Sequence, residues 1–248
     1  MQETMPNPLS LIPLIFLSII GSLVWFALYF ATRRMFSHKC TEFSSRIVAC
    51  IHAISMTILC LLCLKQGPNP LDGGEGESNT WLQIFTMLSS LSYFVYDLCW
   101  CLYYQTEPII MLLHHVASII SLGCILAMGL SGAEAVAGLG SMEVTNPLLQ
   151  ARWFLRTAGY NRTPIHTLVE VVFIVMFVAM RLVYGSRLTY TMITSNKVPW
   201  QVKTCTGALF LISITFLYHI FEFVKRKYID RSGTHCHPII CEPDIKDD

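Results

Sequence analysis

The sequence predicts an all-α fold, a polytopic membrane helix bundle of about seven transmembrane helices. Of the 248 residues, 54% are hydrophobic and only 13% are charged, and the apolar residues gather into long runs. Ordinary soluble domains carry about 25% charged residues, whereas a membrane-spanning helix needs about 20 mostly apolar residues in succession. The composition therefore excludes a water-soluble globular enzyme as the default class. A net charge of only +1, without a long basic run, also predicts no nucleic-acid partner.

Seven windows are apolar and long enough to span a bilayer. They run from about Leu11 to Ala31, Arg46 to Leu64, Trp81 to Tyr104, Ile109 to Met128, Gly132 to Gln150, Ile165 to Gly185 and Trp200 to Val224. We expect the first window to be a retained span rather than a signal peptide, because its basic residues, Arg33 and Arg34, follow it instead of preceding it. The fifth is the weakest because it contains Glu134, Glu143 and Asn146-Pro147, and it is counted because a helix bundle can satisfy such groups internally.

Basic residues predict how the bundle is oriented. By the positive-inside rule, the segments that follow the first, fifth and seventh spans lie in the cytosol. These segments hold Arg33, Arg34, Lys39 and Arg46, then Arg152, Arg156 and Arg162, then Lys225, Arg226, Lys227 and Arg231. The acidic, glycine-rich loop 72–77 falls on the opposite side. The predicted orientation is therefore N-terminus outside and C-terminus inside the cytosol.

The chain divides into three parts on this interpretation. Residues 1–40 are an N-terminal transmembrane anchor with a basic cytosolic linker, residues 41–230 are the helix bundle, and residues 231–248 are a polar tail predicted to be flexible. The tail contains His235-Cys236-His237 and Cys241, but this spacing matches no standard zinc site. We therefore predict no metal site and no cofactor.

Polar side chains in the third and fourth spans are the first candidates for a site. The third span carries Tyr93, Tyr96, Asp97 and Trp100 on one face at helical spacing. The fourth carries the adjacent pair His114 and His115, which point about 100° apart on a helix. His114 aligns with Ser118 and Ser121 and is predicted to point inward, whereas His115 aligns with the more apolar Ile119 and Leu122.

Depth brings these groups together with the fifth span. The short turn 105–108 makes the third and fourth spans antiparallel neighbours, with Asp97 and His114 roughly 10 Å from its end of the bundle. Glu143 and Asn146 fall roughly 9–13 Å from the same end. Pro147 lacks an N–H and is expected to kink the fifth span. The sequence thus predicts one polar layer, formed by Asp97, His114, His115, Glu143 and Asn146.

Two interpretations of this layer stay open. Its members either hydrogen-bond one another and fix the helix register, or they form a ligand or catalytic site, because ionisable groups inside spans are costly and usually functional. Other charges have simpler explanations. Glu170 suits the N-terminal part of the sixth span, Arg181 lies near an outer end where it can snorkel, and His52 is assigned neither role.

Four segments in order resemble the TLC-domain superfamily, and more narrowly its small, poorly characterised members. They are residues 92–97 (SYFVYD), 114–115 (HH), 143–147 (EVTNP) and 152–155 (RWFL). The resemblance covers most of the chain after the first span. Relatives in this superfamily include the ceramide synthases, which transfer an acyl group from acyl-CoA to a sphingoid base and have paired histidines in the active site. His114 and His115 match that pair.

A later helix of those enzymes departs from this sequence. There it carries a His-Asp pair, a second Asp and a Glu, and the corresponding residues here are Met142, Glu143, Asn146 and Gln150. Only one acidic group is kept and the histidine is replaced by an apolar thioether, so a mechanism that uses that helix's histidine does not carry over.

Three hypotheses follow for function. In the first, the bundle binds or regulates membrane lipids through an internal cavity, as the resemblance implies for phospholipid or sphingolipid composition. The lipid-binding or substrate-binding candidates are Tyr93, Tyr96, Trp100, Ser118, Asn146, Arg152 and Arg156. In the second, the protein is an acyl-CoA-dependent lipid N- or O-acyltransferase with the catalytic candidates His114, His115, Asp97 and Glu143. In the third, it is a membrane scaffold or trafficking adaptor.

The expected partners are membrane lipids and, for the enzyme, acyl-CoA. We expect the chain to be an integral, multi-pass membrane protein. The sequence does not distinguish between the endoplasmic reticulum and the plasma membrane as its location.

Overall fold

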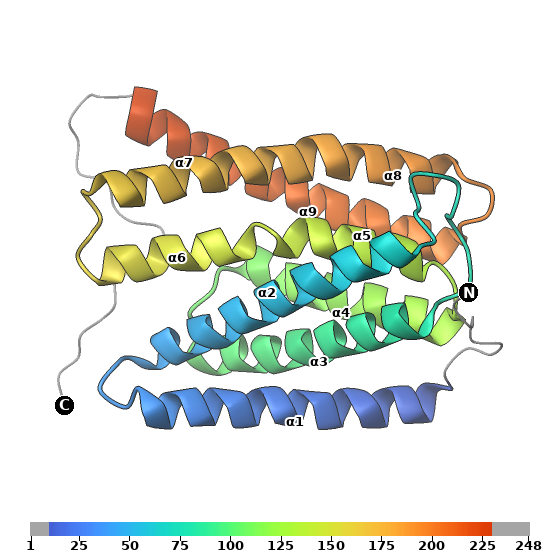
Figure 1. The fold of residues 1–248 in the computed structure, drawn as a ribbon, viewed down its shortest axis with the longest axis horizontal. Helices are drawn as coiled ribbons and strands as arrows, with labels where there is room; N and C mark the ends of the chain where they lie inside the picture. The colour runs from blue at the N-terminus through green and yellow to red at the C-terminus, as the bar shows by residue number, and fades with distance from the viewer. Residues whose placement is uncertain (1–9, 230–248) are drawn as a thin grey trace.

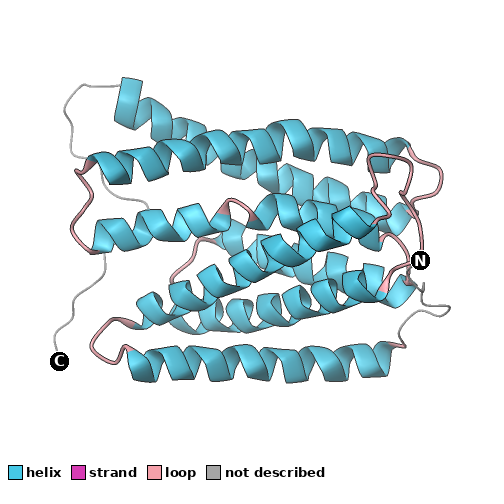
Figure 2. Ribbon diagram, viewed as in Figure 1, coloured by secondary structure: helices cyan, strands magenta, loops and turns pink. Residues whose placement is uncertain are grey.

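The computed structural model describes residues 10–229, which form a bundle of roughly parallel and antiparallel helices joined by loops, the longest of them residues 67–80 (Figure 1). Within this range all regular secondary structure is helical (Figure 2). The β-type pairing among these residues is one isolated bridge between Ser78 and Leu130. The all-α class predicted from the sequence is confirmed. The tail residues His235, Cys236, His237 and Cys241 lie outside the described residues.

The helices follow the predicted windows, except that the fifth window is broken in two and the sixth continues to Thr194. Their bounds are α1 Leu11–Met35, α2 Thr41–Gln66, α3 Trp81–Tyr104, α4 Ile109–Met128, α5 Gly132–Glu143, α6 Asn146–Thr157, α7 Pro164–Val178, α8 Gly185–Thr194 and α9 Trp200–Val224. Two π-helical segments continue α7 and α9, over Ala179–Tyr184 and Lys225–Ile229. Among the described residues, six helices are long and apolar enough to cross a membrane: α1, α2, α3, α4, the continuous helix Pro164–Thr194, and Trp200–Tyr228.

The predicted fifth span is a broken helix and not a continuous one. It consists of α5 and α6, of 12 residues each, and neither reaches the length that a spanning helix needs. The break falls where Pro147 enters the first turn of α6, because proline cannot donate the backbone bond that would continue α5. The two halves follow one another along the bundle, so together they occupy the position of one span (Figure 1).

The ends of the helices separate by charge. α1 begins at one end of the bundle and the last π-helical segment finishes at the other, as an odd number of crossings requires (Figure 1). The end where α1, α3 and α6 finish carries basic last-turn residues, among them Arg33, Arg34 and Arg156. Which end faces the cytosol stays a prediction from the positive-inside rule.

Local signals in the sequence set the α3–α4 hairpin. Thr80 and Gln83 form a capping box at the start of α3, each side chain satisfying a backbone N–H of the other. Gln105 ends α3 in the left-handed conformation, and Pro108 precedes the first turn of α4. The predicted antiparallel neighbours are confirmed, and this hairpin brings Asp97 toward the paired histidines.

Helix α1 is a full member of the bundle. A Cβ on Gly21 would lie 2.7 Å from the Cβ of Ser92, so the two backbones approach more closely than larger residues allow. Ser22 donates a hydrogen bond of 2.9 Å to the Ser92 carbonyl, and the Trp25 indole donates one of 3.3 Å to the Ser89 carbonyl. The predicted anchor therefore packs along α3, and it also contacts α2 and α4 (Figure 1).

Candidate functional site

The first element of the site is a carboxylate–imidazole pair between α3 and α4. Asp97 Oδ2 lies 3.4 Å from His115 Nε2. His115 is only 5% exposed, and its other ring nitrogen, Nδ1, is buried with no hydrogen-bond partner among the described residues. A carboxylate that holds one ring nitrogen while the other stays unpaired fixes the orientation of the imidazole and leaves a nitrogen available to a ligand.

His114 has different surroundings. Its ring contacts the rings of Phe94 and Phe216, with centroid distances of 6.2 and 5.7 Å. The sequence placed His114 on the inward face and His115 on the apolar one, whereas the structure gives His115 the deeper burial and the carboxylate. The reason is that α4 packs against α3 on one side and α9 on the other, so both adjacent histidines face a helix.

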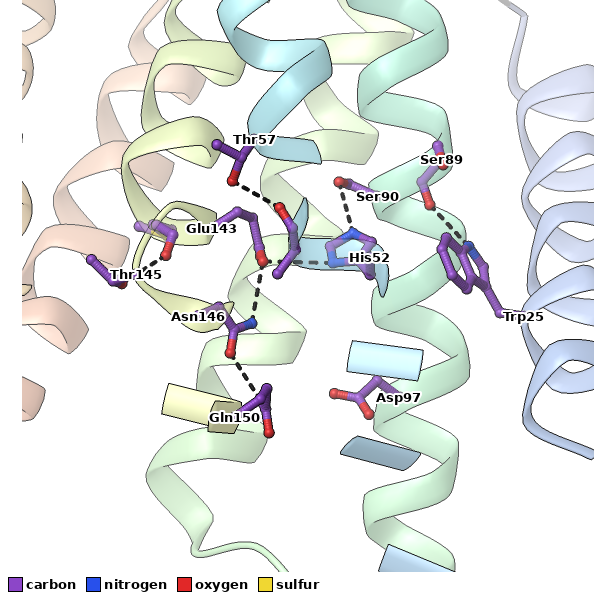
Figure 3. Close-up of polar contacts among 12 residues, drawn as sticks. Trp25, His52, Thr57, Ser89, Ser90, Asp97, Glu143, Thr145, Asn146 and Gln150 are labelled. Atoms are coloured by element: carbon purple, nitrogen blue, oxygen red, sulfur yellow. Dashed lines mark hydrogen bonds and ion pairs between the residues drawn. The ribbon is translucent and has the colours of Figure 1, made fainter. Parts of the chain in front are cut away.

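A second carboxylate–imidazole pair joins α2 to the broken helix. His52 is fully buried, with its Nδ1 at 3.6 Å from Glu143 Oε2 and its Nε2 at 3.2 Å from the Ser90 hydroxyl (Figure 3). Its ring stacks on Tyr93 at a centroid distance of 3.7 Å and an interplanar angle of 11°. Three helices thus meet at His52, a residue to which the sequence assigned no role.

A chain of hydrogen bonds leads from Glu143 toward the α3–α4 turn. Asn146 donates to Glu143 Oε2 at 3.2 Å, Gln150 donates to Asn146 at 2.9 Å, and Arg46 donates to Gln150 at 3.2 Å. Arg46 also pairs with Glu42 and lies 3.8 Å from Glu107 in the α3–α4 turn. Burial raises the pKa of the Glu107 carboxyl above its ordinary value, and the Arg46 guanidinium opposes this shift.

The predicted polar layer is therefore spread over two levels. His52 and Glu143 lie level with each other, whereas Asp97 lies level with Gln150, nearer the α3–α4 turn (Figure 3). The depth estimated from the sequence placed Asp97 and Glu143 in the same half of the bundle. It was too coarse to show that they lie at different levels along the bundle axis. The result is a column of polar groups along the bundle axis, walled by α2, α3, α4 and the α5–α6 break.

Two of the predicted aromatic lipid contacts face α1 and not an open space. Tyr96 is fully buried and packs edge-on against Phe26 at 4.9 Å. Trp100 contacts Tyr29 of α1 and Tyr104 at the end of α3. Both side chains fill the α1–α3 interface, which could not be foreseen without knowing that α1 packs there.

The basic residues at the end of α6 differ in their partners. Arg152 lies 3.7 Å from Glu170 and over the ring of Phe173, whereas Arg156 is partly exposed. Glu170 is only 2% exposed and also contacts Lys227 and the Tyr228 hydroxyl. The expectation that Glu170 acts through the helix N-terminus was wrong, because it lies in the second turn of α7 and is the counter-charge for two basic residues.

An apolar cavity of about 100 Å³ lies beside the polar column, between α4, α5, α8 and α9. Its walls include Phe94, Leu122 and Leu188, with flexible methionines at positions 142, 180 and 192. The predicted ligand residue Ser118 lines it, together with the hydroxyls of Ser121 and Ser213. Phe94 separates the cavity from the histidines, since its ring contacts both His114 and His115.

One group of side chains near the histidines has donor atoms that suit a metal. Oxygen, sulfur and nitrogen atoms of Asp97, Cys101 and His115 all lie within 4.8 Å of one another. Zinc accepts this donor set, and three protein ligands are the number that leaves a coordination position open. The sequence predicted no metal site, and Cys101 was not among its candidates.

The comparisons with known proteins agree with this architecture. The TLC domain family model matches residues 42–225. The chain belongs to the TLC domain family. It is also similar to TLC domain-containing protein 4-B of Danio rerio, with 27% identity over 184 residues that cover 66% of this chain and 67% of the relative. With its spanning helices, the chain is an integral, multi-pass membrane protein of the TLC family.

The TLC domain contains every polar group of the column, whereas α1 lies before the matched region and is bound to it through α3. Sequence reasoning missed His52, Arg46 and Arg181 in this domain. A signal for His52 was present: it shares a helical face with small buried residues of α2, Ser45, Ala49 and Ala53. Arg46 was missed because it lies at the end of a predicted span, where the positive-inside rule already accounts for a basic residue.

Proposed function

We propose that this TLC-domain protein binds a membrane lipid inside its helix bundle and thereby regulates membrane phospholipid or sphingolipid composition. The observation that carries the proposal is the apolar cavity next to the polar column. Ligand sites in proteins are mostly apolar clefts with a few placed polar groups, and helix bundles form them between facing helices. Here the acyl chain enters the cavity, and Ser118 and the neighbouring serines provide the polar contacts.

The cavity has to enlarge around a whole acyl chain. Its volume of about 100 Å³ is smaller than an engineered apolar cavity of roughly 150 Å³ that holds benzene. Methionine side chains are flexible and adapt to differently shaped neighbours, and Met142, Met180 and Met192 all belong to the lining. Gly138 and Gly185 leave two further wall positions without a side chain.

A matched pair of glycine substitutions tests lipid binding. A Cβ on Gly138 would be 3.9 Å from Leu188 and would point into the cavity region, whereas a Cβ on Gly123 of α4 would meet nothing within 4 Å. The full chain is purified in mild detergent and its bound lipids are measured by native mass spectrometry. Gly138→Leu should lower occupancy about tenfold or more, because an overfilled site costs binding free energy, and Gly123→Leu should not. Equal occupancy in all three proteins would contradict the proposal.

One observation favours acyl transfer as a second candidate. Asp97 orients the His115 ring and leaves Nδ1 unpaired, which is the arrangement in which a carboxylate-bound imidazole serves as general base or acyl acceptor. The test is incubation of the purified protein with labelled acyl-CoA and a panel of lysolipids and long-chain amines. Turnover that Asp97→Asn abolishes would support this candidate, and absence of turnover across the panel would contradict it.

A further inference from the structure

Arg181 lies in the interior of the bundle, far from either end of its helix. The continuous helix Pro164–Thr194 places it 13 residues from the nearer end, or about 20 Å at 1.5 Å per residue. Its guanidinium turns into the bundle and donates to Ser213 of α9 instead of extending toward an outer end, so the expectation that Arg181 snorkels was wrong. The residue is only 8% exposed and belongs to the π-helical segment Ala179–Tyr184. Such π-helical turns inside α-helices occur frequently at functional sites.

The guanidinium of Arg181 has no carboxylate partner among residues 10–229. It donates a hydrogen bond of 3.1 Å to the Ser213 hydroxyl and lies over the Phe177 ring at 5.0 Å, and its Nε is buried without a hydrogen-bond partner. Neither nearby carboxylate forms an ion pair with Arg181. Glu143 accepts from Asn146 and faces His52. Glu134, which also lines the cavity, accepts a bond of 2.6 Å from the Gly76 N–H with Oε1, and its Oε2 is buried without a hydrogen-bond partner among the described residues.

A buried arginine keeps its positive charge, because the guanidinium does not lose its proton in proteins. A charge inside a membrane span is costly and marks a functional position when it lacks a protein partner. Arg181 and its hydrogen-bond partner Ser213 both line the apolar cavity, together with the hydroxyls of Ser118 and Ser121. A positive charge without an ion-pair partner therefore lies at the wall of a cavity that can receive an apolar chain.

We propose that Arg181 binds the carboxylate of a long-chain fatty acid whose hydrocarbon chain lies in the cavity. This inference rests on the proposed lipid-binding function and specifies the class of its ligand. Arginine presents paired N–H donors that match a carboxylate, and the unpaired Nε is such a donor. A fatty acid is favoured over a phospholipid because its head group is the carboxylate alone, so the cavity of about 100 Å³ has to enlarge only around one hydrocarbon chain.

The test compares ligands of equal chain and different charge. Delipidated full-length protein in detergent is titrated with oleate, oleyl alcohol and lysophosphatidylcholine, and bound ligand is counted by native mass spectrometry. Wild-type protein should bind oleate at least about tenfold more tightly than oleyl alcohol, since hydrogen bonds to charged groups are the stronger ones. Arg181→Gln should remove this preference, and Arg181→Lys should keep part of it. The matched control is Arg187→Gln, an exposed arginine of the same continuous helix, which should behave as wild type.

The outcomes separate this inference from the function on which it rests. If Gly138→Leu weakens every ligand but Arg181→Gln leaves the oleate preference unchanged, lipid binding stands and the role of Arg181 is overturned. A wild-type preference for lysophosphatidylcholine over oleate overturns it as well, without any variant. If no ligand binds and Gly138→Leu changes nothing, the proposed function fails and the inference fails with it.

Discussion

His52 Nδ1 lies 3.6 Å from Glu143 Oε2, so a fully buried histidine of α2 meets its carboxylate at the residue where α5 ends. This contact ties the second helix to the break in the fifth crossing. Because both groups are buried, removing either one leaves the other without its partner in a medium of low polarity.

We expect His52→Ala to lower the free energy of unfolding by about 1–3 kcal/mol, the cost of an unpaired buried polar group. The control is His219→Ala, since His219 is an exposed residue of α9. Thermal unfolding in detergent, followed by tryptophan fluorescence, measures the difference. Equal stability of the two variants would show that the His52–Glu143 contact contributes nothing.

The Glu170 cluster gives a second prediction about stability. Glu170→Gln removes the counter-charge of Arg152 and Lys227 at a site where the carboxylate is buried. We expect a loss of about 1–3 kcal/mol. Glu222→Gln breaks the exposed i,i+4 pair with Arg226 and should cost at most about 0.5 kcal/mol. The same unfolding measurement applies, and a larger loss for Glu222→Gln would contradict the structure.

The two histidines of α4 should differ in function, because only His115 has a carboxylate partner. Any acyl transfer from acyl-CoA should fall about 10²–10⁴-fold in His115→Ala, the contribution of a general base. His114→Ala should retain most of it, since the His114 ring makes contacts with aromatic rings. The measurement is initial rate with labelled acyl-CoA on protein shown to be folded. A greater loss in His114→Ala would reverse the assignment.

A Cys101 variant distinguishes two interpretations of the Asp97–His115 contact, a direct pair and a pair bridged by a metal ion. The sequence predicts no metal, so we expect purified protein to contain well below one zinc per chain by elemental analysis, and Cys101→Ser to change neither lipid occupancy nor turnover. Stoichiometric zinc in the wild type that is lost in Cys101→Ser would show that the three side chains form a metal site.

Packing of α1 on the TLC domain gives a prediction about the residues before the matched region. Gly21→Val places a side chain against Ser92, where even a single Cβ would be 2.7 Å from the Ser92 Cβ and closer still to its hydroxyl. We expect overpacking to cost about 1–3 kcal/mol. Gly207→Val in α9, where a Cβ meets nothing within 4 Å, is the control. Unchanged stability of Gly21→Val would mean that α1 is not tightly bound to α3.

The sequence predicted most of the fold because apolar run length and turn chemistry are local properties. Trp81–Tyr104 and Ile109–Met128 have the predicted ends to the residue. Pro147 marked the break, but a kink and a complete interruption look alike in sequence. The continuation of α7 through the π-helical segment to Thr194 was missed, because Arg187 and several polar residues resemble a loop outside the membrane.

The site was predictable only in part, because partners depend on which helices pack together. The short α3–α4 turn was enough to bring Asp97 to the paired histidines. It could not choose between His114 and His115, since that choice depends on the positions of α3 and α9 around α4. Arg181 and Ser213 come from segments whose proximity no local pattern records, so their contact was missed.

The position of a bound lipid tests the central claim most directly. Cells that express the full chain are fed a palmitate analogue with a diazirine in its chain, which enters their lipids, and the protein is irradiated, purified and mapped by peptide mass spectrometry. Labelling inside the bundle, at Ser121 or Leu122 of α4 and at Met142, should exceed that in Gly138→Leu and should disappear with excess unlabelled palmitate. Labelling confined to outward residues such as Leu113 and Ile120, unchanged by competitor, would contradict a lipid within the bundle.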